Sequence, residues 1–290
     1  ILPPYEKSTS SEWYTGTANA IYQNLEYMES FHPDYVLILS GDHIYKMDYQ
    51  VMLDYHKENN ADVTIAAMPV PIEEASRFGI VITDDSGKIT EFQENPPQPK
   101  SNLASMGIYI FSWKALKEAL VALKDEPGCD FGKHIIPYCH EKGERLFAYE
   151  YNGYWKDVGT IDSLWEANMD LLNKNNALDL NDSSWKIYTE DVTALPQFIG
   201  ADADIDRAFI TQGCVINGTV KNSVLFTGAK VAAGAKVIDS VLMPGVEVAE
   251  GAVVTRALVA DKVKIGKNAV VGSADSENIE LVAKRVKGEE

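Results

Sequence analysis

The stretch from residue 223 to residue 273 reads SVLFTGAKVAAGAKVID, SVLMPGVEVAEGAVVTR and ALVADKVKIGKNAVVGS, three copies of one pattern of 17 residues. Aliphatic residues return at this interval in two series: Val231, Val248 and Ile265, and Val237, Val254 and Val271. Within one copy the two series lie six residues apart. This period predicts a parallel β-helix of hexapeptide type with one residue dropped per turn, whose stacked coils bury their aliphatic side chains.

Coils of this type wind left-handed, against the usual handedness of crossover connections. Residues 208–290 are therefore predicted to form a left-handed parallel β-helix. A β-sandwich is the alternative fold, but its strands do not repeat at fixed small-residue positions. Residues 183–207 contain Trp185, Pro196 and Gly200 and are predicted to be a linker with little regular structure.

Residues 1–182 show another pattern, in which strand-like and helix-like segments alternate from about residue 12, as in an α/β sheet. The nearly continuous apolar run 35–40 is typical of a buried parallel strand. Thr17 is the expected N-cap of a first helix. The other expected strands are 62–68, 79–83, 89–92, 106–111 and 146–151, and the other expected helices are 48–60, 113–124 and 161–173.

The composition excludes several classes of protein. The 290 residues carry a formal net charge of −17 with no basic run, which argues against nucleic-acid binding. The three cysteines, Cys129, Cys139 and Cys214, form no CxxC pair, so a disulfide framework or a zinc site is not expected, and the cytoplasm is the expected location. The apolar runs are too short to span a membrane.

The apolar run 35–40 ends in Gly41 and Asp42. Ligands of open α/β sheets bind outside the carboxyl ends of the strands. A carboxylate at such a place, after a glycine that allows close approach, suits Mg²⁺ bound to phosphate oxygens. The alternative is that Asp42 only caps a turn or a helix.

Several colinear motifs resemble those of bacterial ADP-glucose pyrophosphorylases, the glucose-1-phosphate adenylyltransferases. They are Trp13-Tyr14-x-Gly16-Thr17-Ala18, Gly41-Asp42-His43-Ile44-Tyr45, Ala104-Ser105-Met106-Gly107-Ile108-Tyr109-Ile110-Phe111, Asp130-Phe131-Gly132-Lys133, and Tyr154-Trp155-Lys156-Asp157-Val158-Gly159-Thr160. With the repeats they cover nearly the whole chain. The resemblance implies a Rossmann-like α/β nucleotidyltransferase domain followed by the β-helix.

The resemblance also implies a reaction: the phosphate of glucose 1-phosphate attacks the α-phosphorus of ATP, which gives ADP-glucose and pyrophosphate, the first committed step of bacterial glycogen synthesis. Such a reaction needs positioning and charge stabilisation more than covalent catalysis. By resemblance, Asp42 and Asp157 hold the catalytic Mg²⁺. For Asp157 the alternative is an exposed turn residue.

Seven residues match positions that surround glucose 1-phosphate in this family: Glu94, Ser105, Tyr109, Asp130, Phe131, Lys133 and Trp155. Tyr14 and Gly16 match the segment near the adenine end of the ATP site. Each has a structural alternative. Tyr109 and Phe131 suit a hydrophobic core, Lys133 suits a solvated surface, and Trp13, beside this segment, suits core packing as well as it suits the site.

Three positions depart from the family pattern. Asn95 stands where a lysine binds the sugar phosphate, and Asn19 and His134 stand where acidic residues are common. In addition, the Gly-rich phosphate loop of the family does not precede Tyr14. These differences predict an N-terminally truncated chain that is inactive alone, and they keep open a non-catalytic regulatory paralogue that assembles with an active subunit. The family suggests a homotetramer, or a hetero-oligomer with such a paralogue.

Two further alternatives concern the repeats. An acyltransferase β-helix typically needs a histidine base in its coils, but all five histidines precede residue 208. A pure β-helix scaffold has no need for the Gly41-Asp42 and 154–160 motifs. We therefore expect the β-helix to serve structure, oligomer contacts and effector binding.

Overall fold

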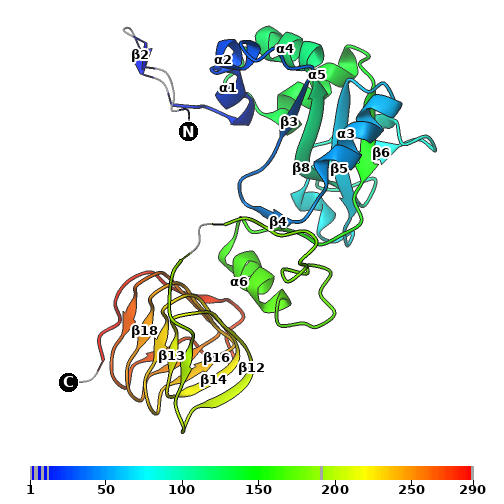
Figure 1. Ribbon diagram of the computed structural model, residues 1–290. Helices are drawn as coiled ribbons and strands as arrows, with labels where there is room; N and C mark the ends of the chain where they lie inside the picture. The colour runs from blue at the N-terminus through cyan, green and yellow to red at the C-terminus, as the bar shows by residue number, and fades with distance from the viewer. Residues whose placement is uncertain (1, 3–5, 8–9, 12, 190–191, 289–290) are drawn as a thin grey trace. The chain divides into compact units, whose positions relative to one another are not determined.

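The computed structural model describes residues 2, 6–7, 10–11, 13–189 and 192–288. They form two compact units, each of which is described by itself (Figure 1). Within the described residues, every helix is too short or too polar to pass through a membrane.

The first unit combines residues 1–41 with residues 47–152 and holds a mixed six-stranded sheet. Its strands are β3 (Tyr35–Ile38), β5 (Val63–Pro69), β6 (Ile80–Thr83), β7 (Ile89–Gln93), β8 (Leu103–Ser112) and β9 (Leu146–Glu150). The order is β7-β6-β8-β5-β9, with β3 also paired to β8. The short strands β1 (Glu6–Lys7) and β2 (Ser10–Ser11) pair with each other.

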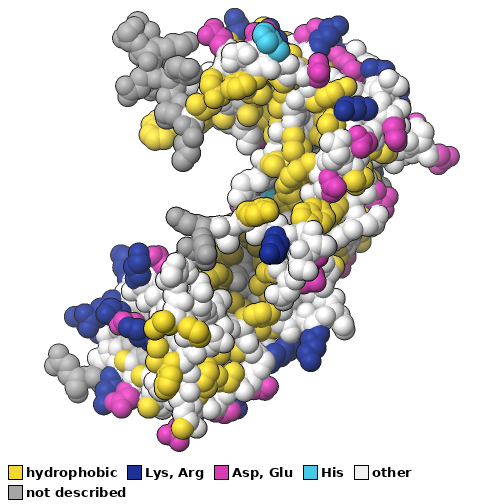
Figure 2. All heavy atoms as spheres, viewed as in Figure 1, with side chains coloured by type: hydrophobic (Ala, Val, Ile, Leu, Met, Phe, Trp, Pro, Cys, Tyr) yellow, Lys and Arg dark blue, Asp and Glu magenta, His cyan; other side chains and the backbone are white. Residues whose placement is uncertain are grey.

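The strand at residues 35–40 differs from the prediction. β3 pairs antiparallel with β8, through Ile38 opposite Tyr109, and β5 with β9 is the parallel pair among the described strands of this sheet. Leu37 is 37% exposed and Leu39 is 44% exposed, so the run is not buried on both faces. Figure 2 shows hydrophobic side chains on the surface over this region. The prediction failed because the face of β3 that carries Leu37 stays partly exposed, although Tyr35 on the same face contacts His56 of α3.

The helices of this unit cover both faces of its sheet. They are α1 (Thr17–Tyr22), α2 (Leu25–Glu29), α3 (Tyr49–Glu58), α4 (Trp113–Ala122) and α5 (Ile136–Glu141), with short turns η1 (Ala75–Arg77) and η2 (Phe131–Ile135). On one face His56 of α3 binds Thr64 of β5. The neighbouring Ile65 points to the other face, where it packs in a core with Leu116 and Leu120 of α4.

The first helix also begins differently from the prediction. Its N-cap is Gly16, and no side chain caps it. The hydroxyl of Thr17 instead donates to Asp130 Oδ2 at 2.7 Å. The helical stretch breaks into α1 and α2, and at the break the Asn24 side chain donates to the Ala20 carbonyl oxygen at 2.8 Å.

The second unit contains residues 42–46 and 153–290, and most of it is a parallel β-helix. Its coil strands are β11 (Phe198–Ile199), β12 (Asp204–Ile210), β13 (Val215–Ile216), β14 (Thr219–Leu225), β15 (Lys230–Val231), β16 (Lys236–Ile238), β17 (Val241–Leu242), β18 (Glu247–Val248), β19 (Val253–Thr255), β20 (Ala257–Val259), β21 (Lys264–Ile265), β22 (Val270–Val271) and β23 (Glu280–Val282).

The 17-residue period sets the register between neighbouring coils, because residues 17 positions apart pair with each other. Val237 lies beside Val254, and Val254 lies beside Val271 in the next coil, all in parallel pairing. The same three residues belong to one buried core inside the coils. The β-sandwich alternative is therefore wrong. The left-handed winding stays a prediction.

The β-helix begins earlier than residue 208. β11 pairs in parallel with β13, so Phe198 already belongs to the first coil and lies within the segment 183–207 that was expected to be a linker. The sequence pattern is weak there because the outer side chains of the first coil stay exposed, Phe198 by 58% and Ile205 by 36%.

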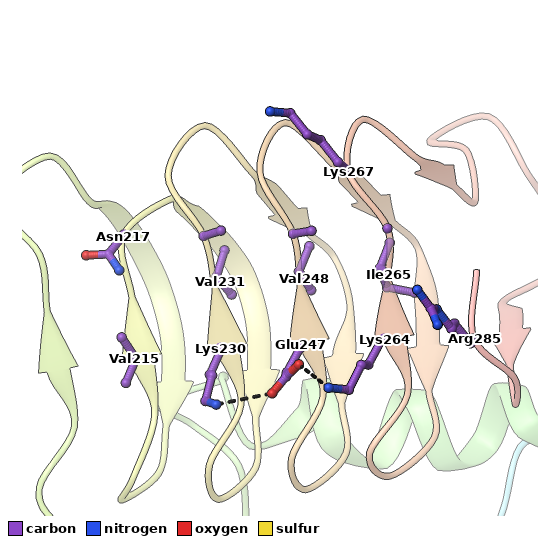
Figure 3. A pocket seen from close by; sticks show the side chains of 13 residues that line it. Val215, Asn217, Lys230, Val231, Glu247, Val248, Lys264, Ile265, Lys267 and Arg285 are labelled. Atoms are coloured by element: carbon purple, nitrogen blue, oxygen red, sulfur yellow. Dashed lines mark hydrogen bonds and ion pairs between the residues drawn. The ribbon is translucent and has the colours of Figure 1, made fainter. Parts of the chain in front are cut away.

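One face of the β-helix carries a row of charges. Lys230, Glu247 and Lys264 lie side by side on consecutive coils, and ion pairs of 3.1 and 2.8 Å join them (Figure 3). With Lys267 and Arg285 they line a shallow groove of about 580 Å³.

Helix α6 (Ile161–Asp170) belongs to the second unit and packs on the β-helix. Its Trp165 indole donates to the Asp239 carbonyl oxygen at 2.9 Å, and Asp162 Oδ1 accepts from the Ile279 amide at 3.1 Å. The compact units therefore divide the chain elsewhere than at the expected boundary of residue 182. The division 1–182 and 208–290, based on sequence pattern, remains our proposal for the functional domains.

Candidate active site

Two short strands of the second unit bring Asp42 and Asp157 together. β4 (His43–Tyr45) pairs antiparallel with β10 (Trp155–Asp157), and His43 lies opposite Asp157. The Val158 amide donates to the Asp42 carbonyl oxygen at 3.1 Å, which continues the ladder by one step. Residues that are far apart in the sequence thus share one end of a two-stranded ribbon.

The side chains at this end of the ribbon form a cluster of possible metal ligands. One atom each of Asp42, His43 and Asp157 lie within 4.8 Å of one another. His43 Nε2 is 3.7 Å from Asp42 Oδ1 and 3.9 Å from Asp157 Oδ1. Asp42 is 60% exposed and Asp157 is 31% exposed, so solvent and ligands reach the carboxylates.

The loop after β10 holds Asp157 in place. Asp157 Oδ1 accepts from the Gly159 amide at 2.9 Å. A Cβ atom at Gly159 would lie 3.1 Å from that oxygen, which is tighter than most Cβ contacts. Carboxylate oxygens are the ligands that hard divalent cations prefer, and two carboxylates from different strands are a common donor set for Mg²⁺. The residues therefore fit a divalent cation.

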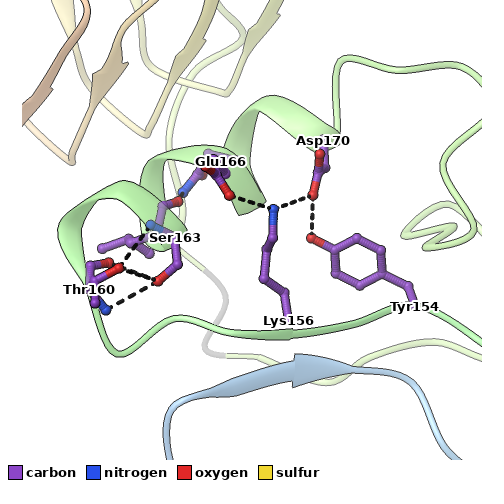
Figure 4. A network of polar contacts seen from close by, with 8 residues as sticks. Tyr154, Lys156, Thr160, Ser163, Glu166 and Asp170 are labelled. Carbon is purple, nitrogen blue, oxygen red and sulfur yellow. Dashed lines mark hydrogen bonds and ion pairs between the residues drawn. The ribbon is translucent and has the colours of Figure 1, made fainter. Parts of the chain in front are cut away.

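The opposite face of β10 attaches the strand to α6. Lys156 alternates with its neighbours and points away from His43, and its Nζ lies 3.1 Å from both Glu166 Oε2 and Asp170 Oδ2 (Figure 4). The Tyr154 hydroxyl donates to Asp170 Oδ2 at 2.8 Å. Burial and then the bond to Asp170 raise the pKa of Tyr154, so it stays a neutral donor.

The helix itself begins with a capping box. Thr160 Oγ1 accepts from the Ser163 amide at 3.2 Å, and the Thr160 amide donates to Ser163 Oγ at 3.1 Å. Because Thr160 follows Asp157 by three residues, the cap fixes where the short loop from β10 must end.

Residues expected around glucose 1-phosphate gather in the first unit, with Trp155 as the exception in the second. Two glycines make room for Glu94: a Cβ atom on Gly132 would lie 2.3 Å from Glu94 Oε2, and one on Gly79 would lie 3.0 Å from it. Burial, and then the nearby charge of Asp130, raise the pKa of Glu94. Lys133 is exposed and its charge opposes that shift.

Asp130 has a structural task that the sequence did not indicate. It is the N-cap of η2: its Oδ1 accepts from the Gly132 amide at 2.9 Å and from the Lys133 amide at 3.2 Å. Its Oδ2 accepts from the Thr17 hydroxyl. Both carboxylate oxygens are engaged, so a sugar hydroxyl would have to share them.

Tyr109, Phe131 and Ser105 are buried. Phe131 is 4% exposed and stacks on Tyr109 with ring centroids 5.7 Å apart, and both belong to the core of the unit. This arrangement agrees with the core alternative retained for these two aromatics. Burial raises the pKa of Tyr109 to about 12. Ser105 Oγ accepts from the Gly107 amide at 3.4 Å, where β8 bulges and Gly107 has φ 67°.

The segment expected near adenine shows close packing at Gly16. A Cβ atom there would lie 2.3 Å from the Cys129 carbonyl oxygen, which explains the glycine without a ligand. The Tyr14 hydroxyl donates to the Leu2 carbonyl oxygen at 2.9 Å and accepts from Asn24 at 3.0 Å. Trp13 is 81% exposed, so the core-packing reading of Trp13 is wrong.

The three departures from the family pattern each have a local structural reason. Asn95 has φ 46°, a left-handed conformation that asparagine tolerates better than lysine. Asn19 Oδ1 accepts from the Thr15 amide at 3.2 Å, and His134 Nδ1 accepts from the Asp130 amide at 3.0 Å.

Four residues of the two clusters escaped the sequence analysis: His43, Gly132, Gly159 and Thr17 as a partner of Asp130. All four stood inside quoted motifs, so the signal was present. No local pattern could indicate that His43 faces two carboxylates, because Asp157 reaches it through a long-range strand pairing.

Comparison with known families agrees with both folds. The family described as nucleotidyl transferase matches residues 2–174, which is more than half of the chain, and a GlmU-like C-terminal hexapeptide family matches residues 197–286. The chain belongs to the nucleotidyl transferase family.

Three similar proteins from different organisms share one name. Proteins named glucose-1-phosphate adenylyltransferase are similar to this chain in Lachnospira eligens (67% identity over 231 residues), Geobacillus stearothermophilus (56% over 239) and Clostridium acetobutylicum (56% over 233). The matches cover 80%, 82% and 80% of this chain. The chain spans 55%, 62% and 61% of the lengths of those relatives.

Proposed function

We propose that this chain is part of a glucose-1-phosphate adenylyltransferase, which joins the adenylyl group of ATP to glucose 1-phosphate and releases pyrophosphate. The observation that carries the proposal is the pairing of β4 with β10, which places Asp42 and Asp157 at one end of a ribbon. Relatives at 56–67% identity bear the name of this activity.

Asp42 and Asp157 are proposed to bind a divalent cation, Mg²⁺ in the cell. When bound, such a cation neutralises phosphate oxygens and stabilises the charge that develops in phosphoryl-type transfer. The chain's own part is to hold the two carboxylates at a fixed separation. The Gly159 amide and the Val158-to-Asp42 ladder bond do this without a mobile side chain.

Glu94, Ser105, Tyr109, Asp130, Phe131, Lys133 and Trp155 are proposed to recognise glucose 1-phosphate, and Tyr14 and Gly16 to lie near adenine. Glu94 is the best supported of them, because the two glycines Gly79 and Gly132 leave space around its carboxylate. A carboxylate of this kind accepts hydrogen bonds from sugar hydroxyls. Lys133 is exposed and supplies a positive charge near it.

The described cysteines are free and buried, as expected for a protein of the reducing cytoplasm, which we propose as its location. The tetramer or hetero-oligomer, and the inactivity of the 290-residue chain alone, remain predictions.

The test is ADP-glucose formation from ATP and glucose 1-phosphate by the protein that carries this chain. Asp42→Asn and Asp157→Asn should each lower kcat by about 100-fold or more, since electrostatic groups of this kind contribute about 3–4 kcal/mol. Asp202→Asn, an exposed carboxylate of the same unit, is the matched control and should leave kcat unchanged. Activity that survives both site variants would contradict the proposal. If a partner subunit made ADP-glucose at the full rate without this chain, the regulatory paralogue would be favoured.

A further inference from the structure

We propose that His43 is a hydrogen-bond donor beside the cation and not one of its ligands, and that Trp155 makes it so by selecting the imidazole tautomer with the proton on Nε2. The inference rests on the proposed function, because it concerns the same pair of carboxylates. It assigns a positioning role to His43 and a specificity role to Trp155.

The bond between the two rings decides the tautomer. The Trp155 indole Nε1 lies 3.3 Å from His43 Nδ1, and the rings meet edge to face with centroids 5.6 Å apart. An indole N–H can only donate, so His43 Nδ1 must accept. A neutral imidazole has one donor and one acceptor nitrogen, so the proton lies on Nε2.

The protonated nitrogen is the one that faces the carboxylates. Nε2 lies 3.7 Å from Asp42 Oδ1 and 3.9 Å from Asp157 Oδ1. A nitrogen that carries a proton has no lone pair to give to a metal, so of the three side chains in this cluster the two carboxylates remain as ligands. Both distances exceed that of a direct hydrogen bond. The N–H therefore acts through its dipole, whose positive end faces both carboxylates and offsets part of the repulsion between them.

The fold keeps the ring in this orientation. His43 is 12% exposed and lies opposite Asp157 in the β4–β10 ladder. Trp155 and Asp157 are two residues apart on β10, so both point to the face that His43 occupies. Lys156, between them, points to α6. A rotation of the imidazole would break the bond to Trp155.

The consequence concerns which cation the site prefers. A site with carboxylate ligands alone favours hard cations such as Mg²⁺ and Mn²⁺, whereas an added imidazole ligand favours Zn²⁺. Removal of the indole donor frees Nδ1 to carry the proton and exposes a lone pair at Nε2. Trp155→Phe should therefore shift the preference of the site toward Zn²⁺.

The first experiment reads the tautomer directly, in the whole chain labelled with ¹⁵N-histidine and without added metal. The chain has five histidines, and His43→Gln assigns the signal of His43. The expected result is a protonated Nε2 and an unprotonated Nδ1. A proton on Nδ1, or rapid exchange between both tautomers, would overturn the proposal.

The second experiment compares Mn²⁺ and Zn²⁺ affinities in wild type, Trp155→Phe, His43→Gln and the double variant. Trp155→Phe should raise the Zn²⁺-to-Mn²⁺ affinity ratio about tenfold, and His43→Gln in the same chain should cancel that rise. Trp13→Phe, at an indole that is 81% exposed, is the control and should leave the ratio unchanged. An unchanged ratio in folded Trp155→Phe, or a wild-type Zn²⁺ affinity that falls with His43→Gln, contradicts the proposal.

Different results would contradict the cation site and the tautomer of His43. Should Asp42→Asn leave Mn²⁺ binding intact, the proposed cation site is wrong whatever the tautomer. Should Mn²⁺ binding depend on Asp42 while His43 carries its proton on Nδ1, the cation site stands and the role of Trp155 is wrong.

Discussion

The β-helix and the β4–β10 ribbon belong to one compact unit but depend on opposite kinds of sequence information. Each coil repeats its neighbour, so Val254 is held by equivalent valines before and after it. The ribbon has one three-residue ladder, and Asp42 meets Asp157 only because that ladder forms. The stability of the β-helix is therefore distributed over many equivalent contacts. The geometry of the site instead depends on the few hydrogen bonds of the β4–β10 ladder.

The largest expected effect breaks the β-helix at its core. Val254 is fully buried among the coils. Val254→Asp should lower the free energy of unfolding by about 4 kcal/mol or more, because it places an unpaired charge in an apolar core. Urea unfolding followed by circular dichroism measures it. Val270→Asp, at a side chain that is 73% exposed, is the control and should change stability by less than about 0.5 kcal/mol. Equal effects of the two variants would contradict the assigned core.

The next effect lies in the first unit and depends on pH. Burial lowers the pKa of His56 to about 4 from 6.5. The unfolded chain therefore takes up a proton first, and stability falls as pH drops from about 6.5 toward 4, by up to about 1.4 kcal/mol per pH unit. His56→Gln should remove that slope, and the exposed His140→Gln should keep it. If the unfolding free energies of wild type and His56→Gln changed with pH in the same way, His56 would not be a neutral buried side chain.

A smaller loss of stability is expected when the ion pairs of Lys156 in the ribbon are removed, and a still smaller one for a lysine on the β-helix surface. Lys156 joins Glu166 and Asp170 at a side chain that is 25% exposed. Lys156→Met should lower the free energy of unfolding by about 1–2 kcal/mol, because Glu166 and Asp170 lose the cation that they share. Lys230→Met, at a lysine of the surface row, is the matched control and should cost no more than about 0.5 kcal/mol. Denaturant titration of both variants decides whether the ribbon is the more sensitive of the two.

The smallest effect concerns the charge row itself. Glu247 lies between Lys230 and Lys264 on the coil surface (Figure 3). Glu247→Gln should lower stability by less than about 1 kcal/mol, and 1 M salt should abolish the difference, since exposed pairs are screened. A larger, salt-independent loss would mean that the row is part of a buried network.

The sequence predicted the β-helix well because its period is local and repeated. It predicted most strands and helices of the first unit within a few residues. It failed at β3, since an apolar run such as 35–40 does not reveal whether a helix covers both faces. It also failed at Thr17, whose hydroxyl binds Asp130 from a distant segment instead of capping its own helix.

The candidate site was predictable as a set of residues and unpredictable as a geometry. Asp42 and Asp157 came from motifs, but their approach depends on a pairing that no short-range pattern encodes. Asp130 shows the reverse case, because a motif residue expected to contact sugar is already engaged as a helix cap. Motifs therefore indicate which residues matter, and long-range hydrogen bonds decide what each of them can do.

The most direct test of the central claim is Mn²⁺ binding to the chain, followed by electron paramagnetic resonance, in wild type, Asp42→Asn, Asp157→Asn and Asp202→Asn. We expect one Mn²⁺ site in wild type and in Asp202→Asn, and an affinity at least about tenfold lower in each of the other two, since each removes one of two charged ligands. Mn²⁺ affinity that is the same in all four proteins would contradict a cation site between β4 and β10.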